Sequence, residues 1–380
     1  MLTFQSKTGL ILLAGMVLCG AVQAGEYTTK AKYALLMDAD TGHIMFDKKA
    51  DEPMHPASMT KLMTAYMVDE AVRVGKYKMS DEFEVSENAW KKGGAATGGS
   101  TMFLNPHQKV RLDDLVKGII IQSGNDACIV VAENMAGTEE AFAAKMTQKA
   151  KKLGMKNTNF KNATGLPDKE HLMSAKDLAI LSKHIIDDFP EQYQIYSQKE
   201  FTYNGIHQNN RNPLLYSLDG ADGLKTGHTS QSGYGLTASV KAKDGRRLIM
   251  VINGLKTEKE RADEARKLMS WGLANFQNSD LLPTDKTLVE VDVWLGKTKK
   301  VHAVPAKNLI QTHAIADDIN AVSVVQYQQP VLAPVQKGQK LGKIITSLAD
   351  KTTVETDLIA AEDVEKVGFF SKIKALFNGG

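Results

Sequence analysis

The spacing of apolar residues changes several times along this 380-residue chain, and those changes constrain the fold more than any other feature. Two short apolar runs, 33–37 and 43–46, flank a segment whose Asp and Gly residues suit a hairpin loop. From Ser58 to about Ile186 the spacing becomes helical, with apolar residues three and four positions apart. We therefore expect the chain to open with part of a sheet and to continue with a helical insert.

Strand patterns return after this insert. The runs that carry them are 224–226, 234–240 and 248–255, and a helical pattern follows near 260–275. Strands on both sides of a helical insert, closed by a helix, predict one domain of the α+β or α/β class over residues 25–277.

The last third of the chain has a different period. Val289, Val291, Val293 and Leu295 alternate with polar residues, which is typical of a half-buried strand. We expect a second, small β-rich domain over residues 284–363.

Residues 1–24 have the composition of an export signal. Lys7 precedes an uncharged stretch from Gly9 to Ala21, and Val22-Gln23-Ala24 places small residues at the cleavage positions. The uncharged stretch has about 13 residues, whereas a membrane-spanning helix needs roughly 20. The pattern favours a cleaved signal over a transmembrane helix and predicts a mature chain that starts at Gly25.

Charge and cysteine content bear on two further classes of protein. The 47 basic and 44 acidic residues leave a formal charge of +3, so we expect no nucleic-acid partner. Cys19 lies in the signal, which leaves Cys128 as the only thiol of the mature chain and allows no intramolecular disulfide. We interpret Cys128 as a small buried hydrophobe; a reactive thiol is the alternative.

Three short motifs carry residues suited to nucleophilic catalysis. In chain order they are Ser58-Met59-Thr60-Lys61, Ser123-Gly124-Asn125 and Lys225-Thr226-Gly227. Each motif alone is weak evidence, because similar runs recur at Ser371-Lys372-Ile373-Lys374, Ser86-Glu87-Asn88 and Lys7-Thr8-Gly9. The surroundings of the first three motifs distinguish them from these repeats.

Ser58 has the surroundings of a nucleophile. It follows Pro56-Ala57 and is expected to open an amphipathic helix, with Lys61 about one turn later on the same face. A serine hydroxyl needs a base at neutral pH, and a lysine serves only when burial or a second cation lowers its pKa. Lys225 would supply that cation. A helix N-cap would explain the serine but not a lysine on the inward face.

The other two motifs would complete such a site. Ser123 and Asn125 would bring a hydroxyl and an amide into the cleft for proton relay and peptide binding. Gly227 would leave room for a substrate backbone along a strand edge, while Lys225 and Thr226 offer a charge and a hydroxyl to a carboxylate. A capped helix start and a solvated strand end are the simpler alternatives.

The order and spacing of these residues resemble the penicillin-recognising serine enzymes. Four segments are similar to low-molecular-mass penicillin-binding proteins of the serine D-alanyl-D-alanine carboxypeptidase (peptidase S11) type: 56–61, 122–128, 210–212 and 222–229. The resemblance extends from about Tyr27 to the end of the chain. It implies an α+β fold, in which a β-lactamase/transpeptidase-like domain with an antiparallel sheet and a helical insert precedes a small all-β domain.

The resemblance also implies an activity. The enzyme would remove the terminal D-alanine from peptidoglycan stem peptides through an acyl-enzyme on Ser58, with Lys61 and Ser123 as further catalytic residues and β-lactams as covalent inhibitors. The residues implied in substrate binding are Asn125, Arg211, Lys225, Thr226, Gly227, His228, Thr229 and Arg261. The backbone N–H groups of Ser58 and His228 would form the oxyanion hole. No metal and no cofactor is implied.

Several alternatives stay open. A class A β-lactamase needs a glutamate for deacylation, and no Glu-x-x-Leu-Asn segment lies between Asn125 and Lys225. A D,D-endopeptidase uses the same chemistry on cross-linked peptides, and a wall-binding protein without activity would share the fold. Arg261 is alternatively an exposed arginine that opens a helix. His171 departs from the spacing seen in the family and is assigned no role.

Residues 364–380 end the chain with an amphipathic pattern. Large apolar residues fall at helical spacing on one face, with lysines available beside it: Phe369, Phe370, Ile373, Leu376 and Phe377. The segment is too short and too charged to span a bilayer, but it suits a helix that lies in a membrane surface. Packing of this stripe on the β domain is the alternative. Together with the export signal, it predicts peripheral attachment at the periplasmic face of the cytoplasmic membrane.

Overall fold

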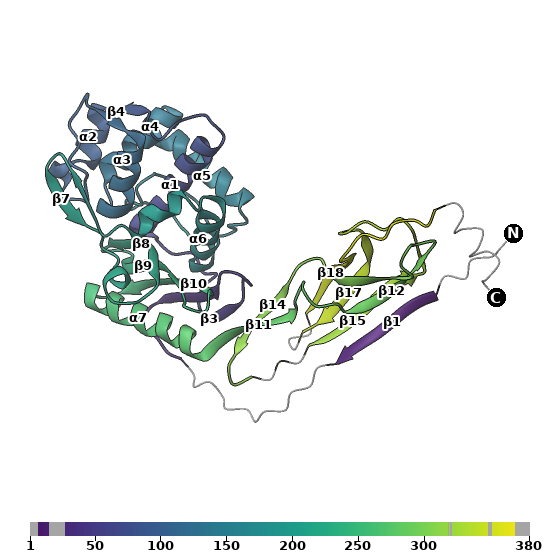
Figure 1. Ribbon diagram of the computed structural model, residues 1–380. Helices are drawn as coiled ribbons and strands as arrows, with labels where there is room; N and C mark the ends of the chain where they lie inside the picture. Colours follow the sequence, from purple (N-terminus) through teal and green to yellow (C-terminus); the bar gives the residue numbers. More distant parts are fainter. Residues whose placement is uncertain (1–6, 15–26, 318, 320, 349–351, 369–380) are drawn as a thin grey trace, which may run out of the picture. The chain divides into compact units, whose positions relative to one another are not determined.

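The structure is a computed structural model that describes residues 7–14, 27–317, 319, 321–348 and 352–368. It divides into two compact units, Glu26–Ala274 and a second one that joins Met1–Gly25 to Asn275–Gly380. Each unit has its own core and is described separately (Figure 1).

The first unit is built on a five-stranded antiparallel sheet of order β3-β2-β10-β9-β8. Its strands are β2 (Tyr33–Asp38), β3 (Ile44–Lys48), β8 (Ala221–Thr229), β9 (Gly233–Lys241) and β10 (Arg247–Leu255). The sequence predicted all five strands. The sheet order leaves β8 on one edge, and β8 carries the third motif.

The helical insert lies between β3 and β8. Its α-helices are α1 (Lys61–Arg73), α2 (Glu87–Gly93), α3 (Leu112–Lys117), α4 (Asn125–Ala136), α5 (Glu139–Lys152) and α6 (Ala175–Asp188). Short turns connect them: η1 (Ala57–Thr60), η2 (Ala95–Thr97), the π-helical turn η3 (Gly118–Gln122), η4 (Gln192–Ser197) and η5 (Pro213–Tyr216). Two small antiparallel sheets of two strands each complete the insert, β4 (Glu82–Glu84) with β5 (Lys109–Arg111) and β6 (Glu200–Tyr203) with β7 (Ile206–Asn209).

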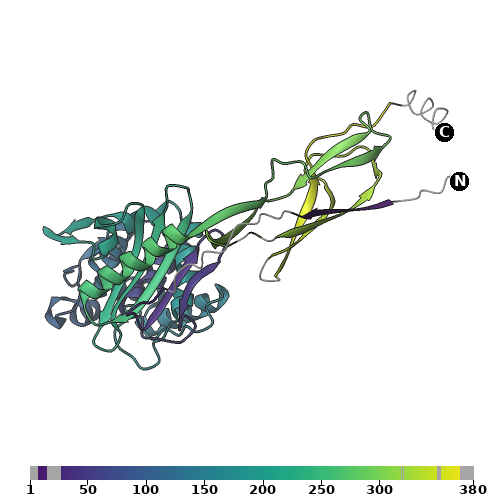
Figure 2. The same cartoon turned by 90° about the horizontal axis from the view of Figure 1, so that it is seen from below.

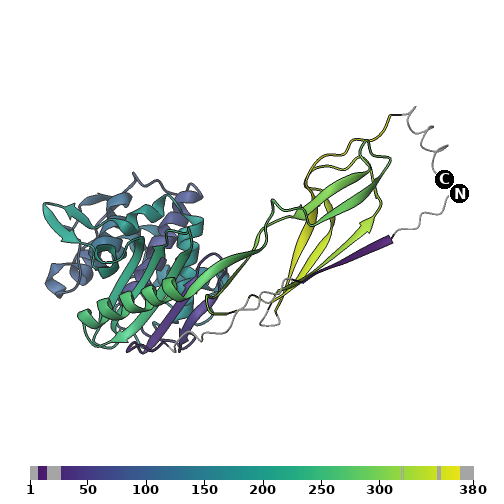
Figure 3. The same cartoon turned by 60° about the horizontal axis from the view of Figure 1, so that its bottom comes forward.

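Helices cover both faces of the five-stranded sheet. The insert packs on one face and α7 (Glu258–Asn275) on the other, as Figures 2 and 3 show. Gly272 of α7 lies so close to Leu36 and Leu248 that a Cβ there would be 2.3 Å from Leu36 Cδ2. With both faces covered, residues 248–253 of β10 are all buried, which explains the continuous apolar run at this strand.

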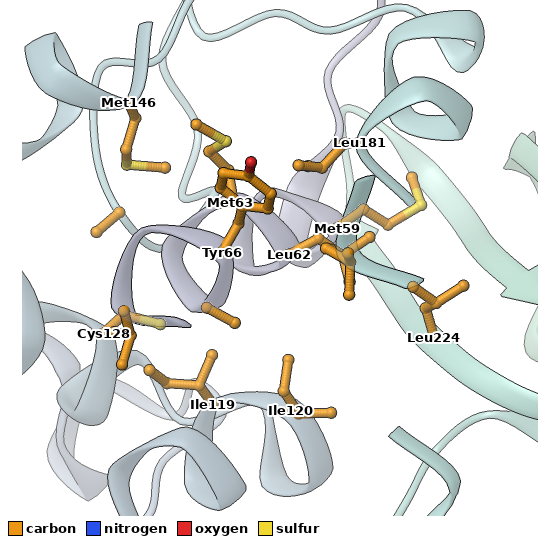
Figure 4. Close-up of a cluster of buried hydrophobic side chains, with 14 of the residues drawn as sticks. Met59, Leu62, Met63, Tyr66, Ile119, Ile120, Cys128, Met146, Leu181 and Leu224 are labelled. Carbon is orange, nitrogen blue, oxygen red and sulfur yellow. The ribbon is translucent and has the colours of Figure 1, made fainter. Parts of the chain in front are cut away.

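The core beneath the first motif is formed mainly by α1 and its neighbours. Leu62, Met63 and Tyr66 of α1 face apolar side chains of η3, α4 and β8 (Figure 4). Burial of this face fixes the orientation of α1, and the motif residues at its start are fixed with it.

The second unit is rich in β-structure. Its strands are β11 (Phe276–Leu282), β12 (Val289–Trp294), β13 (Lys300–Pro305), β14 (Leu309–Ala314), β15 (Val322–Gln329), β16 (Val331–Leu332), β17 (Lys340–Ser347) and β18 (Thr353–Ala360). In β12, Val289, Val291 and Val293 are buried and their neighbours are exposed, which confirms the period of two. Leu295 lies beyond the end of that strand.

The edges of this unit differ from the expected boundaries. β11 precedes residue 284 and pairs with β14. At the other end Val364 is 3% exposed within the core and forms a bridge with Val335, so the unit continues past residue 363.

The two chain ends bear on the predicted signal and anchor. Strand β1 (Lys7–Ala14) pairs with β15, and whether this segment is cleaved stays a prediction. The apolar stripe from Phe369 to Phe377 lies outside the described residues. Within the described part of the chain, no helix combines the length and apolarity needed to cross a membrane.

Candidate active site

Ser58 lies in a strained turn rather than at the start of an α-helix. It belongs to the 3-10 turn η1, and α1 begins only at Lys61. Ala57, just before it, has a φ of +48°, a conformation that residues other than Gly, Asn and Asp rarely adopt. The expected helix start was therefore wrong by one turn. Strained backbone of this kind persists only where the surroundings enforce it, and it is common at active sites.

Lys61 is fully buried and makes three contacts from Nζ. It lies 2.9 Å from Ser58 Oγ, 2.8 Å from Asn125 Oδ1 and 2.8 Å from the carbonyl oxygen of Thr164. Two of these partners can only accept hydrogen bonds. A neutral amine would donate its two N–H groups to them and leave its lone pair for the Ser58 hydroxyl, which is the arrangement that a general base needs.

The electrostatic surroundings favour a neutral amine at this position. Burial is the main cause that lowers the pKa of Lys61, to about 8, and the charge on Arg211 lowers it further. Burial, and then the charge on Lys61, lower the pKa of Lys225 well below its usual value. From the sequence, either burial or a second cation, Lys225, could lower the pKa of Lys61; burial is the larger cause, and the cation that lowers this pKa is Arg211.

The second and third motifs meet through Ser123 and Lys225. Lys225 Nζ donates to Ser123 Oγ at 3.0 Å and to the carbonyl oxygen of Thr226 at 3.1 Å. Ser123 is held at a φ of +62° between η3 and α4. Three parts of the chain thus meet at one group of buried polar side chains: strand β8, the helical insert, and η1, which carries Ser58 and is called the nucleophile turn.

These groups border a cavity of about 300 Å³. Its lining residues are Ser58, Ser100, Ser123, Arg211, Thr226, Gly227, His228, Tyr234, Glu258 and Arg261. Seven of them were expected from the sequence. Lys61, Asn125 and Lys225 are buried and reach the cavity through Ser58 and Ser123, whereas Thr229 bonds through its hydroxyl to Ser232.

Three residues of the lining were not expected as site residues. Ser100 directly follows Gly98-Gly99, and its Oγ accepts from Arg211 at 2.6 Å. Glu258, the first residue of α7, pairs with Arg261 at 2.5 Å. Tyr234 lies opposite His228 on the neighbouring strand. No local motif marks them, because only the tertiary fold brings them to the cavity.

Arg261 is a buried residue and not an exposed helix-opening arginine. Its side chain is 4% exposed and lines the cavity. Burial lowers the pKa of Arg261 and that of Arg211, and Glu258 opposes this effect in both cases. Glu258 therefore compensates part of the cost of holding two guanidinium groups at this cavity.

Gly227 is small because the nucleophile turn lies against it. A Cβ at Gly227 would be 2.8 Å from the carbonyl oxygen of Pro56, and one at its cross-strand partner Gly235 would be 2.8 Å from Met59 Cε. This close approach, rather than room for a substrate alone, is the structural reason for the glycine.

His171 is hydrogen-bonded to the motif that begins at Ser58. It is buried, its Nδ1 accepts from the Lys161 backbone N–H at 3.2 Å, and its Nε2 lies 2.8 Å from Thr60 Oγ1. Burial lowers the pKa of His171 to about 4, so the ring is neutral near pH 7 and its Nε2–H can donate to Thr60. The residue links the 161–165 loop to the turn that carries Ser58.

Cys128 behaves as a buried hydrophobe. It is fully buried beside Ile119, and burial raises the pKa of its thiol to about 12. A thiol that stays protonated is a poor nucleophile, so the reactive alternative is not supported. Among the described residues, no cluster of three His, Cys, Asp or Glu side chains could hold a metal ion.

The chain matches the models of two known protein families. Residues 20–257 match the D-alanyl-D-alanine carboxypeptidase family, peptidase S11, and residues 276–366 match the C-terminal domain of penicillin-binding protein 5. The chain is 41% identical to D-alanyl-D-alanine carboxypeptidase DacC of Escherichia coli over 347 residues, which cover 90% of this chain and 86% of that relative.

Solved structures are similar as well. Penicillin binding protein 5 from Haemophilus influenzae has a TM-score of 0.76 at 36% identity, with 90% of this chain and 100% of that chain covered. Penicillin-Binding Protein D2 from Listeria monocytogenes, in its ampicillin-bound form, has a TM-score of 0.57 at 29% identity, with 65% and 99% covered.

Proposed function

The chain belongs to the D-alanyl-D-alanine carboxypeptidase family of serine peptidases, peptidase S11, and we propose that Ser58 is the residue that forms its acyl-enzyme. The observation that carries this proposal is the contact of 2.9 Å between Ser58 Oγ and Lys61 Nζ, in a buried site where two acceptors take the other N–H groups of the amine. The Ser-x-x-Lys repeat at Ser371 is assigned no part in the reaction.

The proposed reaction has two steps. Ser58 Oγ attacks the carbonyl carbon between the two terminal D-alanines, and its proton passes to Lys61 Nζ. The C–N bond then breaks, the leaving amine takes a proton through Ser123, and the peptide remains as an ester on Ser58. Water attacks this ester, releases the shortened peptide as a carboxylic acid and restores the hydroxyl.

The cationic wall of the cavity suits a substrate that ends in a carboxylate. Arg211, Thr226 and Arg261 are the proposed carboxylate ligands, because all three line the cavity. Thr229, the other residue expected in this role, donates its hydroxyl to Ser232 instead. The guanidinium of Arg211 is already oriented by its hydrogen bond to Ser100. The backbone N–H groups of Ser58 and His228 are the proposed oxyanion hole, where a donor is worth roughly a hundredfold or more in rate.

The same nucleophile would be acylated by β-lactams. An acyl-enzyme formed by ring opening retains the leaving amine, which blocks the normal exit of the product. The ampicillin-bound form of the Listeria relative supports this expectation.

Removal of the nucleophile tests the assignment. Ser58→Ala should abolish both D-alanine release and covalent β-lactam labelling in a folded protein, whereas Ser371→Ala in the decoy motif should leave labelling intact. Retained labelling of the Ser58→Ala variant would refute the assignment. Free D-alanine from a pentapeptide ending in D-Ala-D-Ala, but no cleavage of a cross-linked dimer, would separate carboxypeptidase from endopeptidase activity.

The proposed location is the periplasmic face of the cytoplasmic membrane. An export signal at residues 1–24 and an interfacial C-terminal helix would place the enzyme beside its peptidoglycan substrate. Cleavage at Gly25 is tested by N-terminal sequencing of the exported protein.

A further inference from the structure

Tyr234 lies in the cavity wall, yet no step of the proposed reaction uses it. Its position on β9 is directly opposite His228 on β8, and the two rings are stacked with centroids 3.8 Å apart and an interplanar angle of 25°. Cross-strand pairs of this kind stabilise the register of two strands. His228 is also the residue whose backbone N–H is proposed as an oxyanion donor.

A second group holds the Tyr234 ring. The guanidinium of Arg261 lies 5.7 Å from the ring centroid, a distance at which a cation is attracted to an aromatic ring. Arg261 is itself fixed by the ion pair with Glu258 at 2.5 Å. The side chains of Glu258, Arg261, Tyr234 and His228 thus form one connected series, which we call the stacked series.

The end of the β8–β9 hairpin is fixed independently. Ser232 Oγ accepts from the Thr229 backbone N–H at 3.0 Å and lies 2.9 Å from Thr229 Oγ1. These bonds close the turn between β8 and β9, next to His228. The cross-strand partner of Thr229 is Gly233. Gly227 packs on the turn that carries Ser58, and the stacked series adds a contact to the side chain of His228 itself.

We propose that Tyr234 is a positioning residue, which through the stacked series fixes the backbone of His228 where the oxyanion of the transition state develops. The inference rests on the proposed function. An oxyanion donor acts only within a narrow distance, about 2.7–3.1 Å from the developing charge, so a small displacement of β8 weakens it. The ring therefore affects the rate of acylation without contributing a reacting group.

The alternative roles of Tyr234 give different kinetics. A residue that binds the substrate equally in the ground and transition states changes KM, whereas one that acts on the transition state alone changes kcat. A residue that only packs the sheet changes thermal stability and neither constant.

Two substitutions at Tyr234 separate these roles. Tyr234→Leu should lower kcat by about tenfold or more, with KM changed by less than about threefold, because removal of a whole oxyanion donor costs roughly a hundredfold to a thousandfold. Tyr234→Phe keeps the ring and should restore most of kcat. The acylation rate with a β-lactam should fall in parallel with kcat for Tyr234→Leu.

Glu258 and Asp263 provide a matched pair that does not disturb the ring. Both acids lie in α7, but Glu258 lines the cavity and pairs with Arg261, whereas Asp263 does not belong to that lining and pairs with Lys259 at 2.6 Å. Glu258→Gln should lower kcat severalfold and Asp263→Asn should leave it unchanged. This pair decides the question if Tyr234→Leu does not fold.

The outcomes distinguish this inference from the proposed function. D-alanine release by the wild-type enzyme tests the function alone. If the wild type is active, an unchanged kcat in folded Tyr234→Leu, or a change confined to KM, overturns the positioning role. Equal kcat values for Glu258→Gln and Asp263→Asn overturn the stacked series, and with it the route by which Tyr234 would position His228.

Discussion

Lys61 is a buried amine whose protonation state controls the activation of Ser58. The base form of a lysine is the neutral one, which is present above its pKa. Burial lowers the pKa of Lys61 to about 8. The neutral fraction therefore rises from about a tenth at pH 7 to about nine-tenths at pH 9.

The rate of acylation should follow this fraction. Between pH 7 and pH 9 the second-order rate constant for a β-lactam that is stable over this range should rise by roughly tenfold. Stopped-flow or mass-spectrometric labelling at several pH values measures it. Lys61→Arg is the control, since a guanidinium stays protonated in this range and the variant should show no rise. A rate that falls from pH 7 to pH 9 would contradict the assignment of Lys61 as the base.

The residues of the three motifs could be identified from sequence because each has a reactive group and a fixed spacing. Ser100, Tyr234 and Glu258 could not. Glu258 has the pattern of an acid in the first turn of a helix, where the helix dipole already favours it. Its pairing with a buried arginine depends on how α7 packs on the sheet, with Arg261 over the Tyr234 ring of β9, which no local pattern encodes.

The nucleophile turn and the 161–165 loop form a unit at the scale of the element. Gly165 has a φ of +81°, and a Cβ there would lie 1.8 Å from the carbonyl oxygen of Ala57. The preceding residue, Thr164, supplies the carbonyl that accepts from Lys61. Any side chain at Gly165 must therefore separate the loop from the turn that carries Ser58.

Gly165→Ala should impair both stability and chemistry. We expect a lower melting temperature and an acylation rate reduced by at least about tenfold, because Ser58 and Lys61 are displaced together. Gly154→Ala is the matched control, since Gly154 has a φ of +85° but nothing within 4 Å of its Cβ position. That variant should lose about 1–2 kcal/mol of stability from backbone strain and keep its acylation rate. Equal acylation rates in the two variants would show that close packing at Gly165 is not needed for the reaction.

Elements with a clear period were predicted well, and two elements without one were not. The strands β8, β9 and β10 carry apolar runs that are visible in the sequence. In β11, Gln277 to Asp280 are four polar residues in succession, so no period of two marks the strand that pairs with β14. The turn η1 was expected as the start of an α-helix. Ala57 has a positive φ there because neighbours distant in sequence enforce it, and the local sequence does not show them.

At the scale of the whole molecule, the β unit has its own core and ends later than its sequence period suggested. Val367 donates its N–H to the carbonyl oxygen of Leu295 at 2.9 Å, and Val364 is in the core. A truncation at residue 364 would therefore remove buried contacts. The segment that can be deleted without removing a described contact is 369–380.

Deletion of residues 369–380 tests the proposed membrane anchor. The mature full-length enzyme should sediment with anionic vesicles, and the deleted form should stay in the supernatant with unchanged kcat/KM and an unchanged melting temperature. The reason is that large apolar side chains enter the interface while lysines meet anionic headgroups. Full-length enzyme with Phe370→Ser and Phe377→Ser keeps every lysine, so loss of binding in this variant assigns the effect to the apolar stripe.

The lipid composition of the vesicles separates the contribution of the apolar side chains to membrane binding from that of the lysines. Lysines close to an anionic surface add roughly 1 kcal/mol each, so binding should weaken on zwitterionic vesicles and at high salt. If the full-length enzyme fails to bind anionic vesicles, the anchor is refuted. If the deletion lowers the melting temperature of the β unit, the stripe packs on that unit instead, because an interfacial helix contributes to membrane affinity and not to the stability of the domain that precedes it.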